Sequence, residues 1–309
     1  MTRVRIAAAV SFAALMITAC SALPTAVTTA SPSTSTVTPS AHSKVTLEVV
    51  ERSIVLIQMA WSGYVFVPDR YTESGAGFWS DRVTAYASCT GFFVSKDAMI
   101  ATAGHCVDPQ MGGRMSLATQ YLTDVDRTDL IDTAYQNWTI EGDQNSSPPA
   151  LQLTVFQPTN LPDAVLEKPQ TAQVLDFQPF SEGDNALIRI AALKGTPPLA
   201  LAEQTPALGE PLTCIGFPGL VRDVVDRTTI NRASFKLGNV SSKQTLSSGA
   251  PVTEVSADIA EGMSGGPAIN SAAEVVGINS SRVGVSGGFN FITDTLDLGL
   301  FLRRNGVGG

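Results

Sequence analysis

From Lys44 onward the chain consists of short apolar runs that end at Gly, Pro, Asn or Asp. No long segment of clear helical period separates these runs before the C-terminus. Many short strands with turn signals between them are typical of a β-sandwich or β-barrel and not of a doubly wound parallel sheet. The sequence therefore predicts an all-β fold. The runs include RSIVLIQMAW (52–61), CTGFFVS (89–95), AMIATAGHC (98–106), PALQLTVF (149–156), NALIRIAAL (185–193), EPLTCIGFPG (210–219), APVTEVSADI (250–259) and EVVGINSS (274–281).

The last run, TDTLDLGLFLRR (293–304), has a different residue pattern. Thr293 or Asp294 can serve as an N-cap, and the two arginines at the end of the run suit the C-terminal end of a helix dipole. The sequence predicts a short closing helix here, although the apolar spacing is also partly alternating and Gly299 weakens a helix.

The N-terminus has the pattern of an export signal. A short basic region (1–5) precedes the apolar run Ile6–Ala19, which is shorter than the roughly 18 to 20 residues of a membrane-spanning helix. The sequence ITAC (17–20) resembles a bacterial lipobox, whose cysteine, here Cys20, receives a diacylglyceryl group and becomes the mature N-terminus. Residues 1–19 are then a signal peptide, and the acyl chains anchor the protein to the outer face of the cell membrane. Signal cleavage after Ala22 without a lipid is the alternative, and it leads to the cell wall or medium.

Residues 20–43 follow the signal and are almost all Ser, Thr, Pro and Ala. Such a segment buries too little apolar surface to offset the entropy of ordering it, so it is predicted to be a disordered tether. His42 lies in this tether, where a solvated histidine has no special role. The folded domain is predicted over 44–304.

Charge and cysteine content narrow the function classes. The formal net charge of -8, from 28 acidic and 20 basic residues, argues against nucleic-acid binding. The four cysteines, at 20, 89, 106 and 214, contain no metal-type pair, and we expect no metal and no cofactor. If Cys20 is lipidated, three cysteines remain in an oxidising compartment, so one of them stays unpaired.

His105 is the only histidine in the predicted folded region. A lone histidine at a strand end is more often structural than catalytic. Here Cys106 follows directly, seventeen positions after Cys89. A disulfide between Cys89 and Cys106 would tie two neighbouring strands and fix the strand end that carries His105.

Asp184 stands immediately before the apolar run 185–193. A carboxylate at this point, where a strand enters the core, can be buried against an imidazole N–H. Asp163 and Asp176 are rivals in looser, Pro-containing sequence, and a plain turn aspartate is the alternative role for Asp184.

Ser264 lies between glycines in EGMSGGP (261–267). Its hydroxyl is a weak nucleophile until a base takes the proton, and the N–H groups of Gly262 and Ser264 can form an oxyanion hole. The pattern Gly-x-Ser-x-Gly also marks the nucleophile turn of α/β-hydrolases, but there the histidine follows the serine. No histidine follows Ser264. A Gly-rich loop without chemistry is the remaining alternative.

The three segments TAGHC, DNALI and GMSGGP resemble the catalytic motifs of the chymotrypsin-like (trypsin-like) serine proteases, in the same chain order. The segments at 209–219, 237–242 and 265–281 are similar to stretches of the bacterial HtrA-type and other trypsin-like peptidases. The resemblance covers 44–304. It implies two six-stranded β-barrels, the first at about 44–195 and the second at about 196–292, with the site between them.

The resemblance also assigns roles. His105 would be the general base, Asp184 would orient it, and Ser264 would be the nucleophile. The N–H groups of Gly262 and Ser264 would bind the oxyanion. The implied reaction is hydrolysis of a protein or peptide substrate through an acyl-enzyme, while a catalytically silent binding module and an esterase on the same fold are the alternatives.

Further positions would contact substrate. The segment matching Asn279, Ser280 and Ser281 pairs with substrate backbone in the family, and its plain alternative is a surface strand end. Asp258 lies six positions before Ser264, where trypsin carries the acid that recognises Lys or Arg, although a surface aspartate is the preferred interpretation. Substrate, side-chain specificity and oligomeric state stay open.

The sequence departs from the family in three respects. Met263 replaces the aspartate that pairs with a newly cut N-terminus in members activated by proteolysis, so that activation is expected to be absent. No PDZ-like region is expected after residue 304. The 79-residue gap from His105 to Asp184 is long and contains polar stretches, which predicts an insertion on the first barrel within 107–183.

Overall fold

The computed structural model describes residues 47–191, 193, 195–219, 232–283 and 289–307. The predicted signal peptide, Cys20 and the tether with His42 lie outside this part of the chain. Within the described ranges, every helix is too short or too polar to span a membrane.

The first barrel closes through a pairing between strands far apart in the sequence. β1 pairs with β3 on one side and with β6 on the other, so the sheet returns to its first strand. All pairings around the barrel are antiparallel. The strands, in order around the barrel, are β1 (Ile54–Val67), β3 (Val83–Phe93), β4 (Met99–Ala103), β8 (Asn185–Ile190), β7 (Gln170–Phe177) and β6 (Ala150–Phe156).

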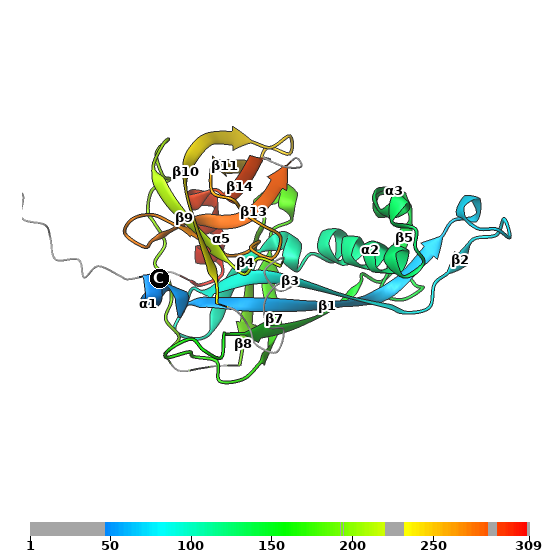
Figure 1. Cartoon of the computed structure of the whole chain (residues 1–309), viewed down its shortest axis with the longest axis horizontal. Helices are drawn as coiled ribbons and strands as arrows, with labels where there is room; N and C mark the ends of the chain where they lie inside the picture. The colour runs from blue at the N-terminus through cyan, green and yellow to red at the C-terminus, as the bar shows by residue number, and fades with distance from the viewer. Residues whose placement is uncertain (1–46, 192, 194, 220–231, 284–288, 308–309) are drawn as a thin grey trace, which may run out of the picture. The chain divides into compact units, whose positions relative to one another are not determined.

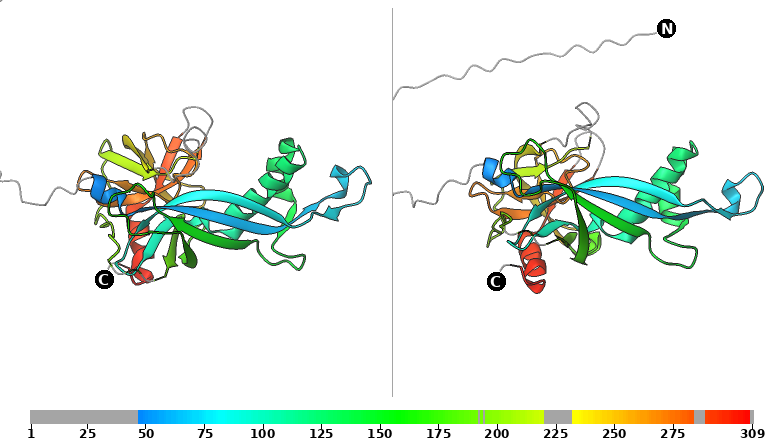
Figure 2. Two further views of the ribbon diagram at one scale, coloured as in Figure 1. Left: turned by 60° about the horizontal axis from the view of Figure 1, so that its bottom comes forward. Right: turned by 90° about the horizontal axis from the view of Figure 1, so that it is seen from below.

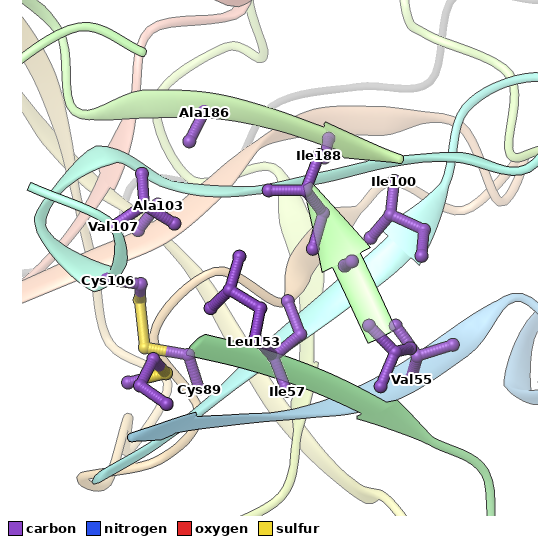
Figure 3. Close-up of a cluster of buried hydrophobic side chains, with 14 of the residues drawn as sticks. Val55, Ile57, Cys89, Ile100, Ala103, Cys106, Val107, Leu153, Ala186 and Ile188 are labelled. Atoms are coloured by element: carbon purple, nitrogen blue, oxygen red, sulfur yellow. A yellow bond between two sulfur atoms is a disulfide. The ribbon is translucent and has the colours of Figure 1, made fainter. Parts of the chain in front are cut away.

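Apolar side chains from several strands fill this barrel. Ile57 of β1, Ile100 of β4 and Ile188 of β8 are fully buried and, with Leu153 of β6, belong to one core cluster. Figure 3 shows these side chains together. Each comes from an apolar run that the sequence predicts to be a strand. Alternate residues of a strand face the same side, so these side chains can meet in the core.

The second barrel is also closed and has six antiparallel strands (Figure 1). Its core includes the fully buried Cys214, Ala268 and Ile292. The predicted all-β class with two six-stranded barrels is confirmed. The strands, in order, are β10 (Ser234–Thr245), β11 (Pro251–Val255), β14 (Phe289–Thr293), β13 (Val275–Val283), β12 (Pro267–Ile269) and β9 (Pro211–Gly216).

The C-terminal helix α5 (Thr295–Arg304) is present as predicted, with Asp294 as its cap. The Asp294 carboxylate accepts hydrogen bonds from the N–H groups of Leu296 and Asp297, which have no partner within the helix. Buried residues on one face of α5 pack against the barrels. At its end Arg304 pairs with Asp176 of β7 at 2.9 Å, so the helix is tied to the first barrel.

The long segment after His105 contains helices that the sequence did not predict. A π-helical turn (Pro109–Gly113) leads into α2 (Arg114–Asp124), which packs on β1 and β3 (Figure 2). α3 (Ile131–Asn137) follows, and then β5 (Thr139–Glu141), which pairs with the outer end of β1. A short strand, β2 (Phe78–Trp79), pairs with the same end of β1.

The predicted insertion is shorter than 107–183. β6 and β7 lie within that range, and both are strands of the first barrel. The inserted structure therefore ends before Ala150, where β6 begins. The run 149–156 predicted β6, whereas β7 is mostly exposed or half-buried, so its sequence resembles a polar loop more than a core strand.

The Cys89–Cys106 disulfide is present, with a Cα–Cα distance of 6.4 Å. It joins β3 to the turn that follows β4 and lies beside Val107 at the end of the barrel core (Figure 3). The third cysteine, Cys214, is a free thiol that is fully buried in the second barrel. Burial raises the pKa of its thiol to about 12, so it acts as a small apolar side chain.

We expect the double variant Cys89→Ala/Cys106→Ala to lose about 3 kcal/mol of unfolding free energy, because the bridge restricts a loop of this length in the unfolded chain. The measurement is equilibrium urea unfolding of proteins that also carry Cys214→Ala, so that thiol exchange does not interfere. Wild type and Cys214→Ala alone are the controls. An unchanged unfolding midpoint in the double variant would contradict this expectation.

Candidate active site

His105 lies in a short 3-10 turn (Gly104–Cys106) directly after β4. The turn is held on one side by the disulfide at Cys106 and on the other by the loop that precedes β8. The backbone N–H of His105 donates to the Asp184 carboxylate at 2.8 Å. The position of the imidazole is therefore fixed by a covalent bond and by a buried charge.

Asp184 is the carboxylate that the fold brings to His105. Its Oδ2 lies 2.9 Å from the Nδ1 of His105, and the residue is 2% exposed. Its backbone adopts a left-handed conformation (φ 55°), which aspartate tolerates better than most residues. The two rivals lie elsewhere, since Asp163 pairs with Arg52 and Asp176 with Arg304.

The pKa of His105 is set by opposing effects. Burial by itself lowers this pKa, because it penalises the charged imidazolium. The charge of Asp184 and its hydrogen bond act in the opposite direction, and Asp108 adds to them. The net result is a pKa for His105 above its ordinary value of about 6.5. The neutral imidazole, the form that accepts a proton, therefore predominates only above this raised pKa.

Ser280 of β13 links Asp184 to Ser264. Its hydroxyl donates to the Asp184 Oδ2, and its backbone oxygen lies 3.4 Å from the Oγ of Ser264. Ser280 is 4% exposed, so these contacts are shielded from water. Sequence reasoning placed Ser280 only on a substrate-binding segment. Its role beside Asp184 was missed because no local pattern marks a hydroxyl that reaches the other barrel.

The backbone of the Ser264 turn explains its glycines. Gly262 (φ 87°) and Gly265 (φ 86°) both have positive φ values, which side chains disfavour. A Cβ atom on Gly265 would lie 2.2 Å from the carbonyl oxygen of Thr90, so the turn can approach the first barrel only without it. Met263 between them is fully buried in the second-barrel core.

The N–H groups of Gly262 and Ser264 have no protein acceptor among the described residues. The carbonyl of Glu261 accepts a hydrogen bond from Gly219 at 2.8 Å. Because C=O and N–H point in opposite directions across a trans peptide, this bond directs the Gly262 N–H away from Gly219. Within the described residues, Gly262 and Ser264 thus keep N–H groups without a protein acceptor on the turn that carries the serine hydroxyl, as an oxyanion hole requires.

The predicted substrate-binding residues Asn279 and Ser281 have different surroundings in the structure. Asn279 is fully buried, and its backbone N–H and C=O bond to Gly266 and Gly265. It therefore supports the Ser264 turn and offers no backbone group to a substrate. Ser281 lies on β13 opposite Phe291 of β14, and its side chain is outside the described part.

Asp258 is exposed on the loop after β11. A carboxylate at the base of a specificity pocket is enclosed by the pocket walls, so this exposure fits the alternative of a surface aspartate. The assignment of Asp258 to substrate binding is not supported by its position.

The two barrels, with a His–Asp pair from the first and a Gly-flanked serine from the second, define the class of chymotrypsin-like peptidases. The chain belongs to the trypsin-like peptidase family, whose domain model (trypsin-like peptidase domain) matches residues 89–278. A comparison with curated proteins finds no match.

Solved structures show the same fold. The active form of the Rv3671c protease from M. tuberculosis superposes with a TM-score of 0.51 at 17% identity, over 85% of each chain. The HtrA-type protease AlgWS227A with a decapeptide has a TM-score of 0.51 at 16% identity, over 84% of this chain and 65% of that chain. At 16–17% identity, these similarities show a shared fold and do not by themselves show a shared function.

We expect the His105 imidazole to titrate above pH 6.5 in the folded protein and Asp184→Asn to lower this midpoint, because burial then dominates. Asp108→Asn should lower it less, since Asp108 is the weaker of the two charges. The measurement is a histidine NMR titration, in which His42→Gln assigns the only other histidine signal. Equal midpoints in wild type and Asp184→Asn would contradict the stated cause of the shift.

Proposed function

We propose that the protein is an exported serine endopeptidase that uses His105, Asp184 and Ser264 as its catalytic triad. The observation that carries the proposal is the continuous set of contacts from His105 through Asp184 and Ser280 to Ser264. It joins a base and its orienting acid from one barrel to a hydroxyl from the other, on a turn where the Gly262 and Ser264 N–H groups have no acceptor among the described residues.

The proposed chemistry brings the Ser264 hydroxyl, which here bonds to the backbone oxygen of Ser280, to the imidazole of His105. Neutral His105 accepts the Ser264 proton while the hydroxyl oxygen attacks the substrate carbonyl carbon, and Asp184 holds the Nδ1–H and stabilises the resulting imidazolium. The N–H groups of Gly262 and Ser264 donate to the tetrahedral oxyanion. The imidazolium then protonates the leaving amine, which leaves an ester of Ser264. A water molecule, deprotonated by His105, hydrolyses that ester and restores the free serine.

A peptide is the substrate class that the fold favours. β12 pairs with β13 only from Val275 to Ile278, and among the described strands residues 281–283 pair only with β14. The free edge there can accept an extended peptide backbone as an added strand. The HtrA-type protease of the same fold is seen with a decapeptide, which supports this assignment.

We also propose that the protein acts outside the cytoplasm and is anchored through a lipid on Cys20, with residues 20–43 as the tether. The lipobox-like ITAC sequence supports the anchor. The disulfide beside His105 supports the export, because such bonds persist in oxidising compartments.

A fluorophosphonate probe is expected to label the wild type and not Ser264→Ala, since phosphonylation requires the activated hydroxyl. His105→Ala should slow labelling by about 1,000-fold or more, because the base is lost. Ser247→Ala, at an exposed serine in the turn after β10, is the matched control and should be labelled like the wild type.

Three outcomes would change the assignment. Labelling of Ser264→Ala at the wild-type rate would exclude Ser264 as the nucleophile. No labelling of well-folded wild type would favour a binding module. Labelling without cleavage of any member of a diverse peptide library would indicate another acyl substrate, such as an ester.

Cells fed an alkyne fatty acid are expected to attach the label to the wild type and not to Cys20→Ser, which should appear in the medium because it lacks the anchor. Cys214→Ala is the control and should keep the label. Retention of the label by Cys20→Ser, detected by gel fluorescence after coupling, would contradict lipidation at this position.

A further inference from the structure

Thr90 lies on β3 next to Cys89 and is fully buried where the two barrels meet. It contacts the second barrel through its backbone and its side chain. Its N–H donates to the carbonyl of Ser264 at 2.8 Å, and its hydroxyl donates to the carbonyl of Gly262 at 2.8 Å. The same hydroxyl oxygen accepts the N–H of Phe217 at 2.9 Å.

These bonds act on the peptide groups of the nucleophile turn. Four consecutive peptide groups, from Glu261 to Gly265, each have their carbonyl oxygen held by a hydrogen bond. Gly219 holds the first and Asn279 the third, and both belong to the second barrel. Thr90 holds the second and the fourth, and it belongs to the first barrel.

The orientation of the Gly262 and Ser264 N–H groups depends on these four carbonyl hydrogen bonds. The N–H groups of Gly262 and Ser264 lie on the first and third peptide groups of the turn. Each is separated from a Thr90 contact by the backbone torsions of a single residue. Gly262 permits many values of these torsions, so its observed conformation needs an external restraint.

The side chain within the turn cannot supply that restraint. Met263 is apolar and fully buried, so it packs but forms no ion pair or strong hydrogen bond. Gly265 has no side chain. The Gly262–Met263 peptide has two polar restraints. Its N–H donates to the nearby carbonyl of Ala260 at 3.0 Å, and its carbonyl accepts from the Thr90 hydroxyl, which is the restraint that comes from the first barrel.

We propose that Thr90 is a positioning residue, whose hydroxyl holds the N–H groups of Gly262 and Ser264 in the orientation that binds the oxyanion. This inference rests on the proposed peptidase function. Thr90 and His105 are each adjacent in sequence to one cysteine of the same disulfide. The proposed base, His105, and the residue that restrains the oxyanion donors, Thr90, are thus both held next to the same disulfide bond.

The test compares two substitutions at this position. Thr90→Val keeps the branched shape but removes the hydroxyl, and it is expected to slow fluorophosphonate labelling about 10- to 100-fold, because the phosphonyl oxygen occupies the oxyanion site. On a cleaved library peptide, kcat should fall by a similar factor while KM changes less than about threefold. Thr90→Ser retains the hydroxyl and should stay within about threefold of wild type in both assays.

Thr196→Val is the matched control. Thr196 is 2% exposed, and its hydroxyl donates to the carbonyl of Ser95, away from the turn. It should lower the melting temperature as Thr90→Val does, without slowing labelling. Wild-type rates for Thr90→Val, or equal slowing by Thr196→Val, would overturn the inference.

Folding is checked by circular dichroism. If Thr90→Val does not fold, Thr90→Ala replaces it with the same expected loss, and failure of both to fold would overturn the inference in favour of a structural role. Failure of the proposed function has a different signature, because the wild type itself would then remain unlabelled.

Discussion

The buried carboxylate of Asp184 imposes the strongest constraint on this structure. A charge out of contact with water is costly unless hydrogen bonds and an opposite charge compensate for it. Here the compensation comes from the backbone and ring of His105 in the first barrel and from the hydroxyl of Ser280 in the second. Both barrels must therefore meet at one point, and the groups of the proposed triad gather there as a consequence.

The second requirement is rigidity at that meeting point. The segment around β3 supplies it twice, through the disulfide from Cys89 and through the hydrogen bonds of Thr90. Asn279 supplies the matching support from the second barrel, with its side chain bonded to the carbonyls of Ile215 and Met263. A flexible Gly-rich turn thereby has one conformation, which catalysis by oriented N–H donors requires.

The fold and part of the site were predictable because their signals are local or follow chain order. Apolar runs marked many of the strands, and Asp294 marked the start of α5. α2 and α3 were not predicted because they are short and mostly polar. α2 packs against β1 and β3, and α3 packs against α2. Their stability comes from packing on neighbouring elements, which a sequence does not display.

The supporting residues were missed for a related reason. Thr90 and Asn279 act through hydrogen bonds to segments more than a dozen residues away, and neither has a residue type or spacing that marks such a role. Ser280 was assigned to substrate contact because the family pattern describes its backbone and not its side chain. Asp258 shows the limit of spacing alone, because its exposure fits the surface aspartate that was the preferred interpretation.

Among the described residues, the inserted segment influences the pKa of His105 through Asp108, at the start of the segment. Asp108 caps the π-helical turn that begins the insertion, by accepting the N–H of Gln110 at 2.8 Å. The same buried carboxylate helps to raise the pKa of His105. α3 and β5 lie farther along the insertion, where β5 pairs only with the outer end of β1. A change of charge at Asp108 therefore alters the pKa of His105, whereas no charge of α3 or β5 in the described structure contributes to the shift.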